Sequence, residues 1–127
     1  MTPVFPHNRC LQALLLILGV LSLTACTPSA DTSSSVEEYA RQARPDDPRL
    51  AEVYVRSCHT CHSDPASGAP LTGDTRRWEP LLDKGMQALL GNVVNGIGGM
   101  PPYGLCMDCS AADFRSLIRF MAEAPQE

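Results

Sequence analysis

The five residues from Cys58 to His62, CHTCH, constrain this chain more than any other stretch of its sequence. They place two thiols and two imidazoles within little more than one helical turn, a density that indicates metal or cofactor chemistry rather than packing. Three chemistries use a CxxC pair of this kind: a zinc site, a redox-active dithiol, and the covalent attachment of a cofactor.

A second CxxC, from Cys106 to Cys109, makes a four-cysteine zinc site the first alternative. The two pairs stand much further apart than the ~15–20 residues that usually separate such pairs. A thioredoxin-like dithiol is the second alternative, and it requires a CxxC at a strand-to-helix junction of a βαβ fold. The sequence shows no alternating strand pattern longer than a few residues, so neither alternative is favoured.

Covalent haem is the third alternative and the one that the motif favours. In C-x-x-C-H, the thiols of Cys58 and Cys61 lie one helical turn apart and can add to two haem vinyl groups, while the imidazole of His62 reaches the iron. His59, inside the motif, is expected to be a solvent-facing spacer. Because Ser110 follows the second CxxC, the sequence predicts one covalently attached haem c.

Residues 1–25 are predicted to be a lipoprotein signal peptide. The apolar run from Leu11 to Leu23 would rise only about 20 Å as a helix, short of the ~30 Å hydrocarbon core of a bilayer. The sequence LTAC, which ends at Cys26, resembles a bacterial lipobox, in which the cysteine is lipidated and becomes the new N-terminus. We therefore expect a periplasmic protein anchored to a membrane through lipid, and Thr27 favours the outer membrane.

The mature chain is expected to be the lipidated Cys26 on a flexible tether, residues 26–48, followed by one domain, residues 49–124. The tether is rich in Ser, Thr, Asp and Pro, and a short helix over Val36 to Arg44 would have little to pack on. The net charge is -4 and there is no long basic run, which argues against a nucleic-acid partner.

The domain is predicted to be all-α, with three to four short helices. Asp47 is the expected N-cap of the first helix, and Ser110 with Asp113 forms a capping box before the last. That last helix carries an apolar stripe at helical spacing, Phe114, Leu117, Ile118 and Met121. A domain this small buries little apolar surface, so a cofactor is expected to complete its core.

Residues 50 to 122 resemble the cytochrome c5 family of class I c-type cytochromes. The resemblance is carried by YVRSCHTCH, GAPLTGD, WEPLLDKGMQALLGNVVNG, GGMPPYGLCMDCS and DFRSLIRFM. It implies a small cytochrome c fold wrapped around one haem, with His/Met ligation of the iron. It also implies single-electron transfer between respiratory partners in the periplasm.

The resemblance implies a role for each matching position. Cys58 and Cys61 would form the thioethers, and His62 and Met100 would be the axial ligands. Pro70 would line the proximal side, where its neighbourhood offers a carbonyl to the ring N–H of His62.

Three further positions match the family. Trp78 would pack near the propionate edge with its indole N–H as a donor, or serve as a plain core aromatic. Cys106 and Cys109 match a family disulfide. The chain departs from the family at Tyr103, where Lys is frequent.

A second departure is Leu81, where Arg is frequent. Leu81 removes the expected partner of the haem propionates, for which Arg76 or Arg77 is the candidate replacement.

With both axial positions of the iron filled, the sequence predicts an electron carrier rather than an enzyme. Its partners would be redox protein donors and acceptors, with no small-molecule substrate. The alternative is a haem c subunit of a larger membrane oxidoreductase. Met100 suits the ligand role because it lies in an irregular loop, between Gly98–Gly99 and Pro101–Pro102.

Overall fold

The computed structural model describes residues 30–123 of the chain, so the predicted signal peptide and Cys26 lie outside the described residues. The α-helices are, in chain order, α2 (Ala30–Gln42), α3 (Pro48–Ser57), α4 (His59–His62), α5 (Thr75–Leu82), α6 (Met86–Asn95) and α7 (Ala111–Ala122). Two 3₁₀ turns, Pro65–Ser67 and Pro102–Leu105, lie in the loops. Over residues 30–123 there is no strand, and none of the helices is long and apolar enough to cross a bilayer.

The all-α prediction is confirmed, but the expected three to four helices are too few. α4 was not expected as a separate helix because it continues α3 beyond Cys58, whose backbone N–H still donates to the Tyr54 carbonyl at 2.9 Å. α5 was not expected because this helix contains Pro80. A proline is normally disfavoured inside a helix, yet here only two residues of the helix follow it.

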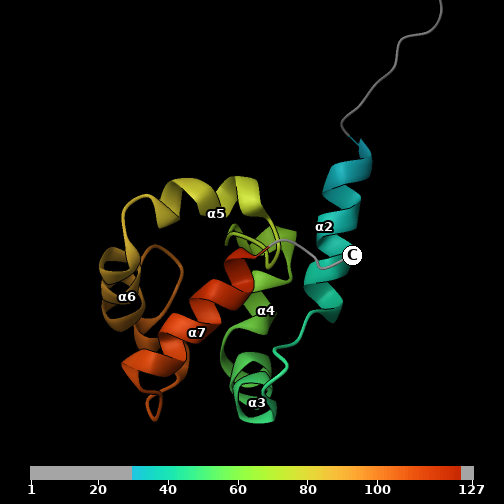
Figure 1. The fold of residues 1–127 in the computed structure, drawn as a ribbon. Helices are drawn as coiled ribbons and strands as arrows, with labels where there is room; N and C mark the ends of the chain where they lie inside the picture. Colours follow the sequence, from blue (N-terminus) through green and yellow to red (C-terminus); the bar gives the residue numbers. More distant parts are fainter. Residues whose placement is uncertain (1–29, 124–127) are drawn as a thin grey trace, which may run out of the picture.

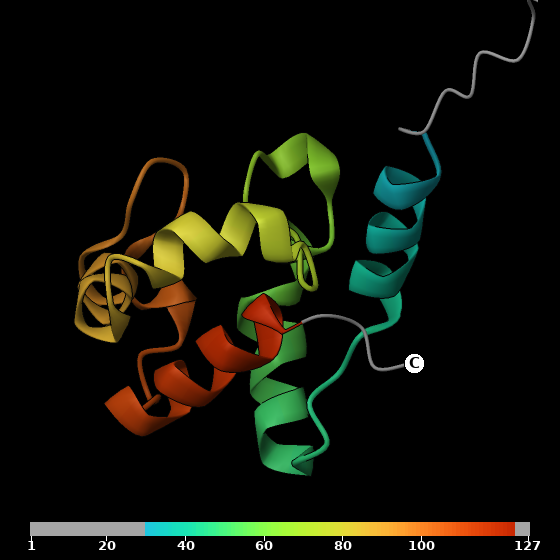
Figure 2. The same ribbon diagram turned by 45° about the horizontal axis from the view of Figure 1, so that its top comes forward.

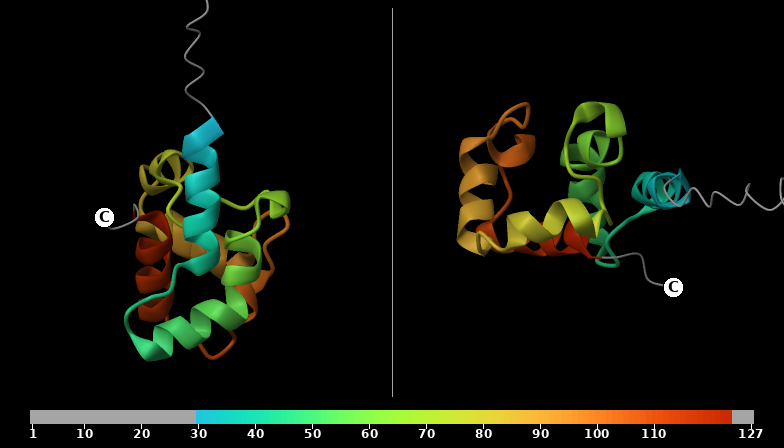
Figure 3. Two further views of the ribbon diagram at one scale, coloured as in Figure 1. Left: turned by 90° about the vertical axis from the view of Figure 1, so that its right-hand side faces the viewer. Right: turned by 90° about the horizontal axis from the view of Figure 1, so that it is seen from above.

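The core lies between α3, α5, α6 and α7. Seen from above, α5 and α7 run along one side, while α6 and α3–α4 stand at opposite ends (Figure 3, right). Figures 1 and 2 show α7 passing between α6 and α3. Each helix turns an apolar face inward, contributing Val53, Tyr54, Trp78, Leu89, Leu90, Val93, Phe114, Leu117, Ile118 and Met121 to one buried cluster. Burial of this cluster supplies the main stabilising free energy of the domain.

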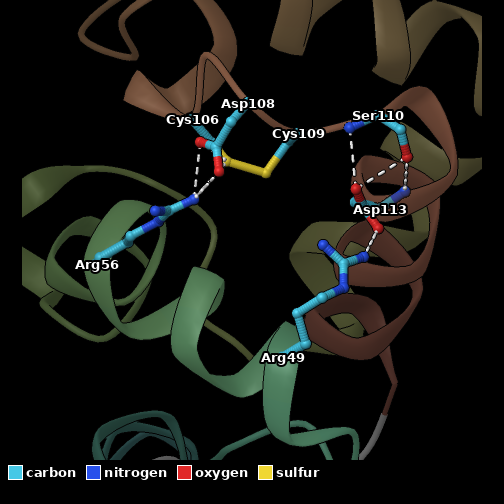
Figure 4. The surroundings of a disulfide bond; sticks show 7 residues. All are labelled: Arg49, Arg56, Cys106, Asp108, Cys109, Ser110 and Asp113. Atoms are coloured by element: carbon cyan, nitrogen blue, oxygen red, sulfur yellow. Dashed lines mark hydrogen bonds and ion pairs between the residues drawn. A yellow bond between two sulfur atoms is a disulfide. The ribbon is translucent and has the colours of Figure 1, made fainter.

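The predicted helix caps are present. Asp47 accepts from the backbone N–H of Leu50 at 2.8 Å, and Ser110 with Asp113 forms a complete capping box. Arg49 of α3 forms an ion pair with the same Asp113 carboxylate (Figure 4). The cap of α7 therefore also ties α3 to α7.

The flexible tether predicted for residues 26–48 is a helix over much of its length. α2 runs beside α4 at the edge of the domain, and its Ala40 is fully buried (Figures 1 and 3). The stripe responsible is Val36, Tyr39, Ala40 and Ala43, at spacings i, i+3, i+4 and i+7. Because two of its residues are alanines, the stripe looks weakly hydrophobic in sequence, yet the small side chains let α2 approach closely.

Candidate functional site

Two neighbouring cavities, of about 340 Å³ and about 320 Å³, lie between helices α3 to α7. They share seven lining residues: His62, Pro70, Val93, Ile97, Met100, Ile118 and Met121. Most of these side chains are apolar, which is typical of a pocket for a large hydrophobic cofactor. Two segments far apart in sequence, α4 and the loop after α6, bring His62 and Met100 to the same space.

The CxxCH motif forms one wall of the first cavity. Cys58 ends α3 and precedes α4, and the backbone N–H of His62 donates to the Cys58 carbonyl at 3.0 Å. This helical geometry puts Cys58 and Cys61 one turn apart, and both line the cavity. Cys58 is half-buried, whereas Cys61 is exposed. The motif therefore faces the cavity from one side and solvent from the other.

The orientation of His62 is set by Pro70. Nδ1 of His62 lies 2.7 Å from the Pro70 carbonyl oxygen, so Nδ1 carries the proton and donates it. Burial lowers the pKa of His62, and the bond to Pro70 opposes this only in part. The ring is therefore neutral near pH 7, and Nε2 keeps its lone pair for a metal ion.

Trp78 lies against His62, but its N–H has a different acceptor from the one predicted. The two rings stack with centroids 5.8 Å apart. The indole N–H donates to the Leu71 carbonyl at 2.8 Å, which corrects the expectation that it serves a propionate. The core-aromatic interpretation is the one that this geometry supports, because a buried N–H already paired with a carbonyl is satisfied.

The loop that carries Met100 is held by its own backbone. Ile97 and Met100 exchange two hydrogen bonds, of 3.1 Å and 2.9 Å. Gly96 adopts φ +77, and a Cβ at this position would lie 2.7 Å from the Met100 carbonyl oxygen. A Cβ at Gly98 or Gly99, the two glycines just before Met100, would meet no protein atom within 4 Å. Gly96 is therefore the glycine whose missing side chain permits the tight loop.

The two cysteines of the second CxxC lie close together. Cys106 and Cys109 are joined by a disulfide with Cα atoms 5.4 Å apart (Figure 4). Asp108, between them, pairs with Arg56 of α3 at 2.8 Å. These contacts fix the turn between the Met100 loop and α7 against α3.

The zinc and dithiol alternatives do not fit this geometry. Among the described residues, the one cluster with metal-ligand spacing is Cys106, Asp108 and Cys109, and its two sulfurs are bonded to each other. Burial raises the pKa of Cys58 to about 11, whereas a reactive dithiol needs a lowered pKa. Residues 30–123 also lack the βαβ unit of a thioredoxin-like site.

Three residues of the site have contacts that the sequence did not predict. His59 is half-buried rather than solvent-facing, and its Nε2 lies 2.9 Å from the Arg41 carbonyl oxygen. Met121 belongs to the buried core, as its place on the apolar stripe predicts, and it also lines both cavities. Arg77, named as a candidate partner of the propionates, donates to the carbonyls of Gly68 and Ala69 at 2.8 and 2.9 Å.

Comparison with known proteins agrees with this geometry. Residues 45–121 match the family model described as cytochrome C oxidase, cbb3-type, subunit III. The chain is 36% identical over 73 residues to cytochrome c5 of Ectopseudomonas mendocina, covering 56% of this chain and 84% of the relative. Identity to cytochrome c5 of Azotobacter vinelandii is 33% over 73 residues, covering 56% and 88% of the two chains.

A solved structure is similar as well. It is titled as the crystal structure of an electron transfer complex of nitrite reductase with cytochrome c. The matched chain superposes with a TM-score of 0.52 at 36% identity, covering 60% of this chain and 93% of that chain. The fold predicted from sequence, a small all-α cytochrome c fold, is thereby confirmed.

Proposed function

The chain belongs to the c-type cytochromes matched by the family model above, as a cytochrome c5-like member of class I, and on this basis we propose how its residues serve that role. It is a single-haem electron carrier, not an enzyme. When bound, the haem supplies a one-electron couple at its iron.

We propose that Cys58 and Cys61 hold the haem covalently and that His62 and Met100 bind its iron. The observation that carries this proposal is that all four residues line one cavity, although they come from two separate segments. The Pro70 carbonyl keeps Nε2 of His62 available, and the apolar lining excludes water from the iron. A filled pair of axial positions leaves no open site for a substrate.

The test is carried out on holoprotein matured in a periplasm. A pyridine haemochrome assay should give one haem per chain that resists extraction by acidified solvent. The reduced protein should not bind CO at low millimolar concentration. Extractable haem would contradict the thioether proposal, and ready CO binding would contradict ligation by Met100.

A second candidate function, a subunit of a larger membrane oxidoreductase, is favoured by the description of the matched family model. Purification from native membranes in mild detergent separates the two candidates. A carrier should elute alone, whereas a subunit should elute with a stoichiometric partner.

We also propose that cleavage removes residues 1–25 and that Cys26 anchors the domain on the periplasmic face of a membrane. The lipobox-like sequence LTAC supports this, and Thr27 favours the outer membrane. Two or more acyl chains suffice for a stable anchor, because each buried methylene contributes ~0.8 kcal/mol. Cys26→Ser should release the protein into the soluble fraction, while Cys10→Ser, in the removed segment, should leave it in the membrane fraction. Unchanged membrane retention of Cys26→Ser would contradict the anchor.

The partners we propose are other redox proteins. The similar solved structure is that of a cytochrome c in complex with nitrite reductase, which supports a protein rather than a small molecule as the partner.

A further inference from the structure

The segment 68–72, which lies beside His62, is fixed almost residue by residue. The Pro70 carbonyl accepts from His62, and the Leu71 carbonyl accepts from the indole of Trp78. The backbone N–H of Thr72 donates to the carbonyl of His62 at 2.8 Å. Pro70 has no backbone N–H to donate, so the position of this segment depends on side-chain donors that bind its carbonyls.

Arg77 holds the first part of this segment. Its Nη2 donates to the Gly68 carbonyl at 2.8 Å and its Nη1 to the Ala69 carbonyl at 2.9 Å. One planar guanidinium thus spans two consecutive carbonyls, the two that precede Pro70. Bonds from a charged donor are stronger than those between neutral groups. A lysine could not reproduce this fork, because its ammonium is a point charge.

α5 therefore carries two adjacent side chains that hold the same segment. Trp78 is buried and holds Leu71, after Pro70, whereas Arg77 is exposed and holds the residues before it. Pro70 lies between these two anchors, so its carbonyl has little freedom to move. This carbonyl is the acceptor that determines the tautomer and the orientation of the His62 ring.

We propose that Arg77 is a positioning residue for His62, acting through the carbonyl of Pro70. This inference rests on the proposed role of His62 as an iron ligand. A firm bond at Nδ1 makes the imidazole more electron-rich and the ligand more basic. An electron-rich ligand favours ferric over ferrous iron, so loosening the segment should raise the reduction potential.

A competing role for Arg77 exists on the same surface. Arg77 and Lys84 both line the second cavity, so Arg77 could also pair with a carboxylate of the haem. A residue that only paired with a carboxylate would affect the potential through charge, without changing the bond at Nδ1 of His62. The experiment therefore needs a measurement of that bond itself.

The variants are Arg77→Lys, which keeps the charge and loses the fork, and Arg77→Gln, which loses both. Arg76→Lys and Arg76→Gln are the matched controls, because Arg76 is the exposed neighbour on the same helix and is absent from the lining of both cavities. In ¹⁵N-labelled holoprotein, NMR measures the hydrogen-exchange rate of the Nδ1–H of His62. Amides of α7 serve as an internal reference for global unfolding.

We expect exchange at Nδ1 to be about tenfold faster in Arg77→Gln, intermediate in Arg77→Lys, and unchanged in both Arg76 variants, with α7 amides constant. The potential of Arg77→Lys should rise, and because the charge is kept, the rise reports the geometry of His62. Unchanged exchange at Nδ1 in both Arg77 variants would overturn the proposal, whatever the potential did. Equal acceleration of the α7 amides would also overturn it, since the role would then be general stability.

A failure of the underlying ligand assignment would look different. If His62 is the ligand, its ring protons in the wild-type protein shift strongly between reduced and oxidised states. Absence of that shift would contradict the proposed function itself, whereas its presence with unchanged exchange in the variants would contradict only the role of Arg77.

Discussion

His59 donates from Nε2 to the carbonyl oxygen of Arg41, 2.9 Å away, and so joins the CxxCH motif to α2. His59, one of the two residues between the cysteines, is therefore not a passive spacer. Burial and the carboxylate of Glu123 raise the pKa of Tyr39, which indicates that α2 also lies near the end of α7. α2 is part of the domain, although it precedes the region that resembles the family.

Ala40→Glu should undock α2 without changing the haem site. Ala40 is fully buried, so a carboxylate there must either lose its hydration or push the helix away. We expect a loss of about 1–3 kcal/mol in the free energy of unfolding, faster amide exchange over residues 36–43, and an unchanged visible spectrum. Ser33→Glu adds the same charge at an exposed position of α2 and is the control. Equal exchange rates in the two variants would contradict the docking of α2.

Met100→Ala should retain covalent haem, because Cys58, Cys61 and His62 are untouched. It should abolish the sulfur-to-iron absorption band at the red end of the oxidised spectrum, lower the reduction potential and allow the reduced iron to bind CO. Met107→Ala is the control, since Met107 is 74% exposed. Met121 lines the same cavity, so loss of the band in Met121→Leu but not in Met100→Ala would assign the ligand to Met121 instead.

Gly96→Ala should disturb the Met100 loop more than Gly98→Ala. Both glycines have positive φ, at +77 and +57, so both variants carry the strain of an L-residue in that conformation. At Gly96 the new Cβ would also lie 2.7 Å from the Met100 carbonyl oxygen, a clash with backbone. We expect destabilisation of about 2–3 kcal/mol for Gly96→Ala and about 1 kcal/mol for Gly98→Ala, measured by denaturant unfolding of holoprotein. The sulfur-to-iron band should weaken only in Gly96→Ala. Equal weakening of the band in both variants would show that the contact between the new Cβ and the Met100 carbonyl oxygen does not disturb the loop.

The double variant Cys106→Ala/Cys109→Ala should fold and bind haem, with a loss of about 2 kcal/mol in the free energy of unfolding, because the bridge closes a very short loop. The Arg56–Asp108 ion pair, 2.8 Å long, should still hold the turn in part. A thiol assay on periplasmic wild-type protein should find neither of these thiols free. Two free thiols per chain there would favour a redox-active pair over a structural bridge.

Local sequence was sufficient for the features that depend on neighbouring residues. The helix caps at Asp47 and Ser110 and the apolar stripe of α7 follow from hydrogen-bonding capacity and helical periodicity, which act over a few residues. The spacing of Cys58, Cys61 and His62 likewise predicts haem attachment without knowledge of the tertiary structure.

Contacts between distant segments required the tertiary structure. Whether Trp78 donates to a cofactor or to Leu71 depends on where α5 lies relative to the segment beside His62, and no pattern around Trp78 records that placement. The docking of α2 depends on its close approach to the rest of the domain. The small side chains of Ala40 and Ala43 permit this approach, but two alanines are too weak a hydrophobic pattern to predict it. The fork of Arg77 on Gly68 and Ala69 is of the same kind, since an exposed arginine pairs with whichever acceptors folding brings within reach. Hydrogen bonds of side chains to backbone carbonyls carry no residue-type signal at the acceptor, because every residue has the same carbonyl.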